Sequence, residues 1–193
     1  MLFRSVIENT YGSVLSGNMI EECNGTAVIL DRDCYGITIS ANVIAHHLGG
    51  GVDLRDAWGC AVSANTFTLA HQFGVRVGPD SGRLTISANA FGNSHIGGKE
   101  KRPAEADAPM QIDEGAGILI EGASDIAVTG NSFAGLPTAA VHATNVSARV
   151  LVPGNSLIDC RRTGEPGAAW LQLAQAPESN AEKNILPPQP NAP

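Results

Sequence analysis

Apolar and polar positions alternate along this chain in short blocks that return at a nearly constant interval. A well-preserved copy lies at 37–44 (ITISANVI), where two alternating apolar residues precede a hydroxyl residue, a small residue, an asparagine and a second apolar position. The asparagines of the six copies are Asn18, Asn42, Asn65, Asn89, Asn131 and Asn155. Their successive spacings are 24, 23, 24, 42 and 24, so the long step is one period plus an insertion. A fixed period of this length predicts a solenoid.

A second apolar alternation precedes each copy and keeps the same phase. One coil then contains a strand at 52–54, a turn at 55–59, a strand at 60–62, a tight turn at Asn65 and a third segment ending at Phe67. Three strands and three turns within one period predict an all-β parallel β-helix, with about six such coils over residues 1–173.

The recurring asparagine has a structural explanation, because its side chain tolerates a left-handed backbone and bonds nearby main chain at a sharp bend. Coils stack about 4.8 Å apart, so successive amides should also bond one another. The large apolar residue two positions later should point inward. These core residues are Ile20, Ile44, Phe67, Phe91, Phe133 and Leu157.

A leucine-rich repeat is the competing solenoid, because its consensus overlaps the asparagine block. It requires a helix or helical turn in the other half of each repeat. Here that half contains three consecutive glycines at 49–51 followed by strand-like alternation. Each glycine disfavours a helix by about 1 kcal/mol relative to alanine, which favours the β-helix.

The blocks resemble the repeats of the pectate lyase-like, right-handed parallel β-helix superfamily over about residues 5–173. That resemblance implies a right-handed coil. It does not transfer a reaction, because this fold serves lyases, glycoside hydrolases, epimerases and non-enzymes. The polygalacturonase patterns Asn-Thr-Asp, Asp-Asp and Gly-His-Gly and the epimerase pattern Asp-Pro-His-Asp are missing from the sequence.

Two segments depart from the periodic pattern. Residues 97–113 form the predicted inserted loop, and residues 174–193 are a proline-rich tail that we expect to be disordered. The first residues already fit the repeat and leave no room for a capping element, so we expect a C-terminal fragment of a longer protein.

Net charge and hydropathy narrow the function classes. The formal charge of -7 gives no whole-protein attraction to nucleic acid, and no apolar run is long enough for a membrane span or export signal. We expect a polysaccharide partner and no organic cofactor. The domain should be a monomer or should stack on N-terminal coils outside this chain, and the parent protein should be extracellular or at the cell surface.

The predicted register gathers charge on the outward face of the first strand. Asp53, Arg76 and His142 share one column, whereas Asp31, Arg55 and Glu121 share the next. Asp53 should pair with Arg76, and Asp31 with Arg55. The alternative interpretation is an ordinary ladder of surface ion pairs, which contributes little.

Histidines add a third predicted column. His47, His71 and His95 recur at the period of the repeat, and Cys23 precedes them by one further period, all in the turn before the first strand. A histidine that titrates near neutral pH can act as a general acid or base.

Two polysaccharide chemistries fit these residues. In β-elimination, Arg55 and Arg76 would neutralise a uronate carboxylate, and His71 would accept the proton. In a glycosidase, Asp31 and Asp53 would be the acid and the base. The predicted catalytic residues are therefore Asp53, Arg76, Arg55, Asp31 and His71. The predicted substrate-binding residues are His47, His95, His142 and Glu121.

Metal binding stays open. Calcium could bind the carboxylates of Asp31, Asp33, Asp53 and Asp56. Four ligands strung along an axis of about 14 Å cannot share one zinc, so a histidine pair is a weaker candidate. The sequence thus supports either a polysaccharide lyase or hydrolase, or a non-catalytic glycan-binding or structural surface module.

Overall fold

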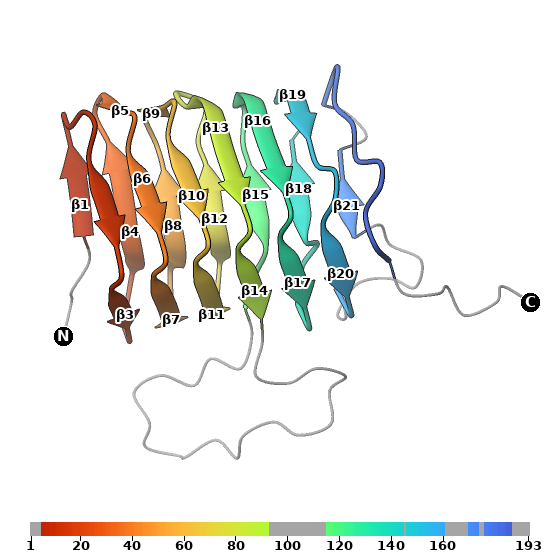
Figure 1. Ribbon diagram of the computed structural model, residues 1–193, viewed down its shortest axis with the longest axis horizontal. Coiled ribbons are helices and arrows are strands. Elements are labelled where there is room, and N and C mark those ends of the chain that lie inside the picture. Colours follow the sequence, from red (N-terminus) through yellow and green to blue (C-terminus); the bar gives the residue numbers. More distant parts are fainter. Residues whose placement is uncertain (1–4, 93–114, 145, 161–169, 174–175, 187–193) are drawn as a thin grey trace, which may run out of the picture.

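The computed structural model describes residues 5–92, 115–144, 146–160, 170–173 and 176–186. Within these residues the chain winds into a parallel β-helix, and each coil contributes one strand to each of three sheets (Figure 1). The predicted loop at about 97–113 lies outside the described residues. Nowhere in the described ranges is there a helix that could cross a lipid bilayer.

The three sheets are named here A, B and C. Sheet A contains β1 (Ser5–Glu8), β4 (Thr26–Asp31), β8 (Gly50–Leu54), β12 (Phe73–Val77), β15 (Ile118–Ile120), β18 (Val141–Ala143) and β21 (Leu171–Gln172). Sheet B contains β2 (Val14–Ser16), β6 (Thr38–Ser40), β10 (Ala61–Ser63), β13 (Gly82–Ser87), β16 (Ser124–Thr129) and β19 (Ala148–Leu151), with the short β5 (Cys34–Tyr35) and β9 (Ala57–Trp58) beside it. Sheet C contains β3 (Met19–Glu21), β7 (Val43–His47), β11 (Thr66–Ala70), β14 (Ala90–Gly92), β17 (Ser132–Ala134) and β20 (Ser156–Ile158).

The turn count is close to the prediction of about six coils. Six asparagines mark the corners from Asn18 to Asn155, so five complete turns separate the first from the last. The predicted turn at 55–59 contains the short strand β9.

The core fills the space between the three sheets with inward-facing side chains. Phe67, Phe91 and Phe133 are fully buried on successive coils, as the sequence predicted. Their rings stack in parallel, with centroids 4.7 Å apart for the first pair and 4.8 Å apart for the second. The apolar side chains of sheets A and B complete the same continuous cluster. The four cysteines are buried as reduced thiols.

The asparagine ladder forms as predicted between sheets B and C. The side-chain amide of Asn65 donates to the Oδ1 of Asn89 at 3.0 Å and to the carbonyl of Ile39 at 3.0 Å. The Oδ1 of Asn65 in turn accepts the backbone N–H and the side-chain amide of Asn42. Each internal asparagine thus satisfies buried main chain and ties its coil to both neighbours.

One detail of the corner was predicted wrongly. The left-handed residue is the one before each asparagine, not the asparagine itself. These residues are Gly17, Ala41, Ala64, Ala88, Gly130 and Gly154, with φ between 54° and 70°. Asparagine is selected for its hydrogen bonds, whereas the preceding residue must be small and takes the strained backbone.

Replacement of Ala64 by glycine should stabilise the protein. Ala64 is exposed and has a φ of 54°, so its methyl group contributes steric strain and little burial. We expect Ala64→Gly to raise the free energy of unfolding by about 0.5–1 kcal/mol. Urea denaturation measures this change. Gly130→Ala, at the equivalent corner with a φ of 66°, is the reciprocal control and should be destabilising.

The C-terminal segment differs from the predicted disorder over residues 176–186. Asn180 and Ile185 pair with the last full coil through bridges to Leu151 and Ser156. Asn184 continues the ladder, because its Oδ1 accepts the side-chain amide of Asn155 at 3.0 Å. This segment therefore covers the C-terminal end of the core with a partial coil.

Candidate functional site

The outward face of sheet A carries the predicted charged columns in the predicted register. Asp53 lies between Ile29 and Arg76, and Arg76 is followed by Leu119 and then His142. Sheet A is hydrogen-bonded on both sides of its central strands, so these side chains project from a rigid scaffold.

Arg55 links the first two carboxylates of the charged cluster. Its Nε donates to Asp53 Oδ2 at 2.8 Å, and its Nη1 lies 3.5 Å from Asp31 Oδ2. The hydrogen bond to Asp53, together with the nearby negative charge, raises the pKa of Arg55 above its ordinary value. The predicted pairing of Asp31 with Arg55 is present.

Arg76 extends the cluster to a third coil. Its Nη1 lies 3.8 Å from Asp53 Oδ2, which gives the predicted pair, and its Nε donates to Glu121 Oε2 at 2.6 Å. Asp53 is 1% exposed, although it belongs to the outward column. Its Oδ1 is the one buried side-chain oxygen or nitrogen of the described residues that has no hydrogen-bond partner.

These contacts limit what the cluster can do chemically. Both arginines are already paired with carboxylates, so binding a uronate would require each to exchange its partner. Three carboxylates (Asp31, Asp53 and Glu121) face two guanidinium groups, which leaves the cluster with an excess negative charge. Asp31 and Asp53 share Arg55 and therefore do not form an unpaired acid and base in this arrangement.

The predicted histidine column does not form. His47 is fully buried and pairs with Ala70, the residue before His71. His71 is exposed in the bend before β12. The alignment of the two histidines was wrong by one position, because the pairing of β7 with β11 follows the shorter step between Asn42 and Asn65. His95 lies outside the described residues.

The buried side chain of His47 has a structural role, because both of its ring nitrogens are hydrogen-bonded to the backbone. Its Nδ1 accepts the backbone N–H of Cys23 at 3.2 Å, and its Nε2 lies 2.9 Å from the carbonyl of Ile20. The neutral tautomer with hydrogen on Nε2 satisfies both bonds. Protonation of Nδ1 would break the bond to Cys23.

This environment predicts a pH dependence of stability. Burial lowers the pKa of His47 from its ordinary value of 6.5, so the unfolded chain binds this proton more readily than the folded chain does. The stability contributed by neutral His47 is present above 6.5 and is lost as the pH falls toward the folded-state pKa. The free energy of unfolding of the wild type, measured with urea, should therefore decrease as the pH falls from about 7.5 to about 5. His47→Gln should show a shallower dependence, and an unchanged dependence would contradict this assignment.

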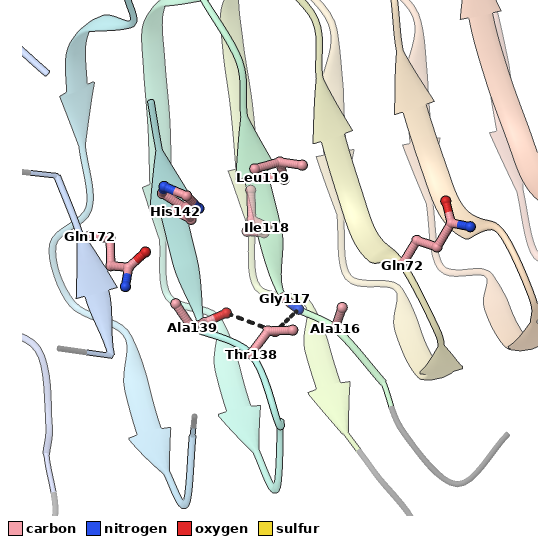
Figure 2. A pocket seen from close by; sticks show the side chains of 9 residues that line it. All are labelled: Gln72, Ala116, Gly117, Ile118, Leu119, Thr138, Ala139, His142 and Gln172. Atoms are coloured by element: carbon pink, nitrogen blue, oxygen red, sulfur yellow. Dashed lines mark hydrogen bonds between the residues drawn. The ribbon is translucent and has the colours of Figure 1, made fainter. Parts of the chain in front are cut away.

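An open pocket of about 410 Å³ lies on sheet A next to the charged cluster, because one of its lining residues, Leu119, is the register neighbour of Arg76. Figure 2 shows His142 and Gln172 projecting side by side from neighbouring strands, with Leu119 one strand further along. Thr138 lies at the edge of the pocket and is fixed by hydrogen bonds to Gly117 N–H and Ala139 O, both 3.1 Å long.

Sequence reasoning found His142 but missed the other polar residues of the pocket. Gln172 pairs with His142 and simply continues its column, so the alternation at 170–173 was a usable signal. Gln72 and Thr138 lie in bends before sheet A strands, where no period marked them.

Comparison with known proteins agrees with this architecture. A family model described as "Right handed beta helix region" matches residues 6–165. The chain belongs to the right-handed beta helix family. No curated protein matches it. This family is consistent with the pectate lyase-like superfamily that the repeats resemble. Membership specifies the fold but not a reaction.

In this right-handed β-helix the candidate site runs along sheet A from Asp31 to Gln172. Among the described residues, no group of three or more histidine, cysteine, aspartate or glutamate side chains could hold a metal ion. Asp31 and Asp53, two of the carboxylates considered for calcium, are bound by Arg55.

Proposed function

We propose that this domain binds a polysaccharide along the outward face of sheet A. The observation that supports this proposal is the pocket of about 410 Å³, which is lined by Leu119, His142 and Gln172 of the outward column of that face. An extended sugar chain could follow the column across successive coils and place one unit in the pocket.

The composition of the pocket suits a sugar. Gln72, His142 and Gln172 supply donors and acceptors for hydroxyl groups, while Leu119 and Ala139 supply apolar contact. Ligand sites commonly combine an apolar lining with a few polar side chains that fix orientation. The surrounding sheet is hydrogen-bonded and needs little ordering when a ligand binds, which reduces the entropic cost of binding.

The charge of the surface favours a neutral polysaccharide over a uronate polymer. The cluster beside the pocket contains one more carboxylate than arginine, and the whole chain has a formal charge of -7. An anionic polymer would be repelled unless Arg55 and Arg76 were released from their partners. The proposal therefore moves away from uronate β-elimination.

Glycoside hydrolysis is the second candidate. The specific observation that favours it is the buried Oδ1 of Asp53, which has no hydrogen-bond partner among the described residues and is therefore an unusual feature. Hydrolysis would require Arg55 to release Asp53. We propose an extracellular or cell-surface location for this domain, where structural polysaccharides are found.

A polysaccharide panel tests both functions. Isothermal titration with neutral, uronate and amino-sugar oligosaccharides should give saturable binding to a neutral ligand. His142→Ala and Gln172→Ala should each weaken it by about fivefold or more. Thr85→Ala, at an exposed position of sheet B, is the matched control and should bind like the wild type.

Turnover separates the two candidates. Release of reducing ends that disappears in Asp53→Asn would support the hydrolase, whereas binding without release supports the binding module. Absence of binding to every member of the panel, or equal loss in Thr85→Ala and His142→Ala, would contradict the proposed site.

A further inference from the structure

Three exposed aromatic side chains form a line on the corner between sheets A and B. Tyr11, Tyr35 and Trp58 are 60%, 57% and 41% exposed, and they occupy equivalent positions on three successive coils. We call them the aromatic strip. Adjacent members are separated by one strand spacing, about 4.8 Å. The strip ends at Trp58, because Gly82 takes the equivalent position on the next coil.

Glycines on the next coil make room for two of the rings. A Cβ atom built at Gly59 would lie 3.3 Å from the ring of Tyr35, and one built at Gly82 would lie 2.7 Å from the ring of Trp58. Each ring therefore lies against backbone on one side, while a large fraction of its surface stays in solvent. The sequence signal is Asp-x-(Tyr/Trp)-Gly at 33–36 and 56–59, which lies outside the asparagine blocks.

A row of carboxylates runs beside the aromatic strip. Asp33 and Asp56 precede Tyr35 and Trp58 by two residues, and Asp80 takes the same position on the next coil. Asp33 Oδ2 accepts a hydrogen bond from the hydroxyl group of Tyr11. Asp56 Oδ2 accepts one from the backbone N–H of Asp33 at 2.8 Å. In the part of the chain that the structure describes, no salt bridge reaches any of these three carboxylates.

We propose that the aromatic strip binds a polymer of amino sugars that carry free ammonium groups. The C–H faces of pyranose rings pack well on exposed tyrosine and tryptophan rings, which supply rigid, amphipathic contact area. The ammonium groups would pair with the carboxylate row and with the faces of the aromatic rings. The even spacing along a straight axis suits a chain of identical units, each about as long as the spacing between neighbouring coils.

This inference rests on the proposal that the domain binds polysaccharide, but it does not rest on the sheet A pocket. The aromatic strip belongs to coils one to three, whereas Leu119, His142 and Gln172 belong to later coils. Variants of one surface can therefore be tested without disturbing the other.

Tryptophan fluorescence provides a local readout. The chain has two tryptophans, so Trp170→Phe leaves Trp58 as the single reporter within the strip. Titration of this variant with a glucosamine hexamer, at a pH that protonates its amines, should give a saturable fluorescence change. A neutral glucose hexamer, a galacturonate hexamer and hexalysine serve as comparison ligands.

Variants then test the two components of the site. In the Trp170→Phe background, Tyr35→Ala should weaken binding of the glucosamine hexamer by about tenfold. Asp33→Asn with Asp56→Asn should weaken it comparably while leaving circular dichroism unchanged, because the amide oxygens can still accept the two hydrogen bonds. Met19→Ala, which removes an exposed apolar side chain away from the strip, should have no effect.

The outcomes separate the inference from the proposed function. Binding that survives His142→Ala but not Tyr35→Ala supports the strip even if the pocket binds nothing. The inference is overturned if Trp58 does not respond to the glucosamine hexamer, if the neutral hexamer binds equally well, or if hexalysine binds more tightly.

Discussion

Asn89→Ala is expected to lower the free energy of unfolding by about 3–5 kcal/mol. Asn89 is 2% exposed and lies in the middle of the asparagine ladder. Its Oδ1 accepts the backbone N–H and the side-chain amide of Asn65, and its own amide donates to Val62 O and Asn131 Oδ1, all at 2.9–3.0 Å. Alanine would remove all four of these bonds from a buried site, and of the bonds between residue 89 and the side chains of the ladder only the one from its backbone N–H to Asn131 Oδ1 would remain. Urea unfolding followed by circular dichroism measures the loss.

The end of the ladder provides a matched control. Asn18 is exposed, and its side chain donates to Ser16 O and Asn42 Oδ1. Asn18→Ala should therefore cost about 1 kcal/mol, because water can replace the lost partners. Equal losses in Asn18→Ala and Asn89→Ala would show that position in the ladder does not matter, contrary to this explanation.

Phe91→Ala should be comparably destabilising, by about 4 kcal/mol. Phe91 is the middle ring of the internal stack, with neighbouring ring centroids at 4.7 and 4.8 Å. Its ring also lies against Gly74, where a built Cβ atom would be 2.6 Å away. Removing the ring would leave a cavity that these hydrogen-bonded coils cannot easily close. Thermal and urea unfolding should both report the loss.

An exposed aromatic residue is the control for this prediction. Tyr35→Ala removes a ring of similar size that is 57% exposed, and we expect a change within about 0.5 kcal/mol. A small effect of Phe91→Ala, or a large effect of Tyr35→Ala, would contradict the assigned positions of the two rings.

The periodic asparagine made most of the fold predictable. Once Asn42, Asn65 and Asn89 are aligned, every residue between them acquires a neighbour on the next coil. The alignment therefore placed Asp53 beside Arg76 and Phe67 beside Phe91, as the observed register confirms. A solenoid is unusually favourable for this reasoning because its contacts follow one interval.

Departures from that interval explain the errors. His47 pairs with Ala70 because the step between these two coils is shorter than its neighbours, so the side chain of His47 is buried whereas that of His71 is exposed. Asn184 was missed because the step from Asn155 is longer than the period. The pocket depends on side chains from bends, such as Gln72 and Thr138, whose positions no period specifies.

The burial of Asp53 within the charged cluster could not be predicted from the alignment of the repeats either. Register predicted that Asp53 faces outward, but it could not show that Arg55 and Arg76 would converge on one carboxylate and leave it 1% exposed. That arrangement depends on side-chain conformation, and it disfavours uronate β-elimination, one of the two chemistries that the sequence left open.

The most direct test of polysaccharide binding on sheet A is a chemical-shift map of isotopically labelled protein. The ligand should be the neutral oligosaccharide that binds most tightly in the panel. Binding should perturb the amides of residues 116–119, 138–142 and 172, which surround the pocket, and leave sheets B and C unchanged. Perturbations confined to sheets B and C, or none at saturating ligand, would contradict the proposal.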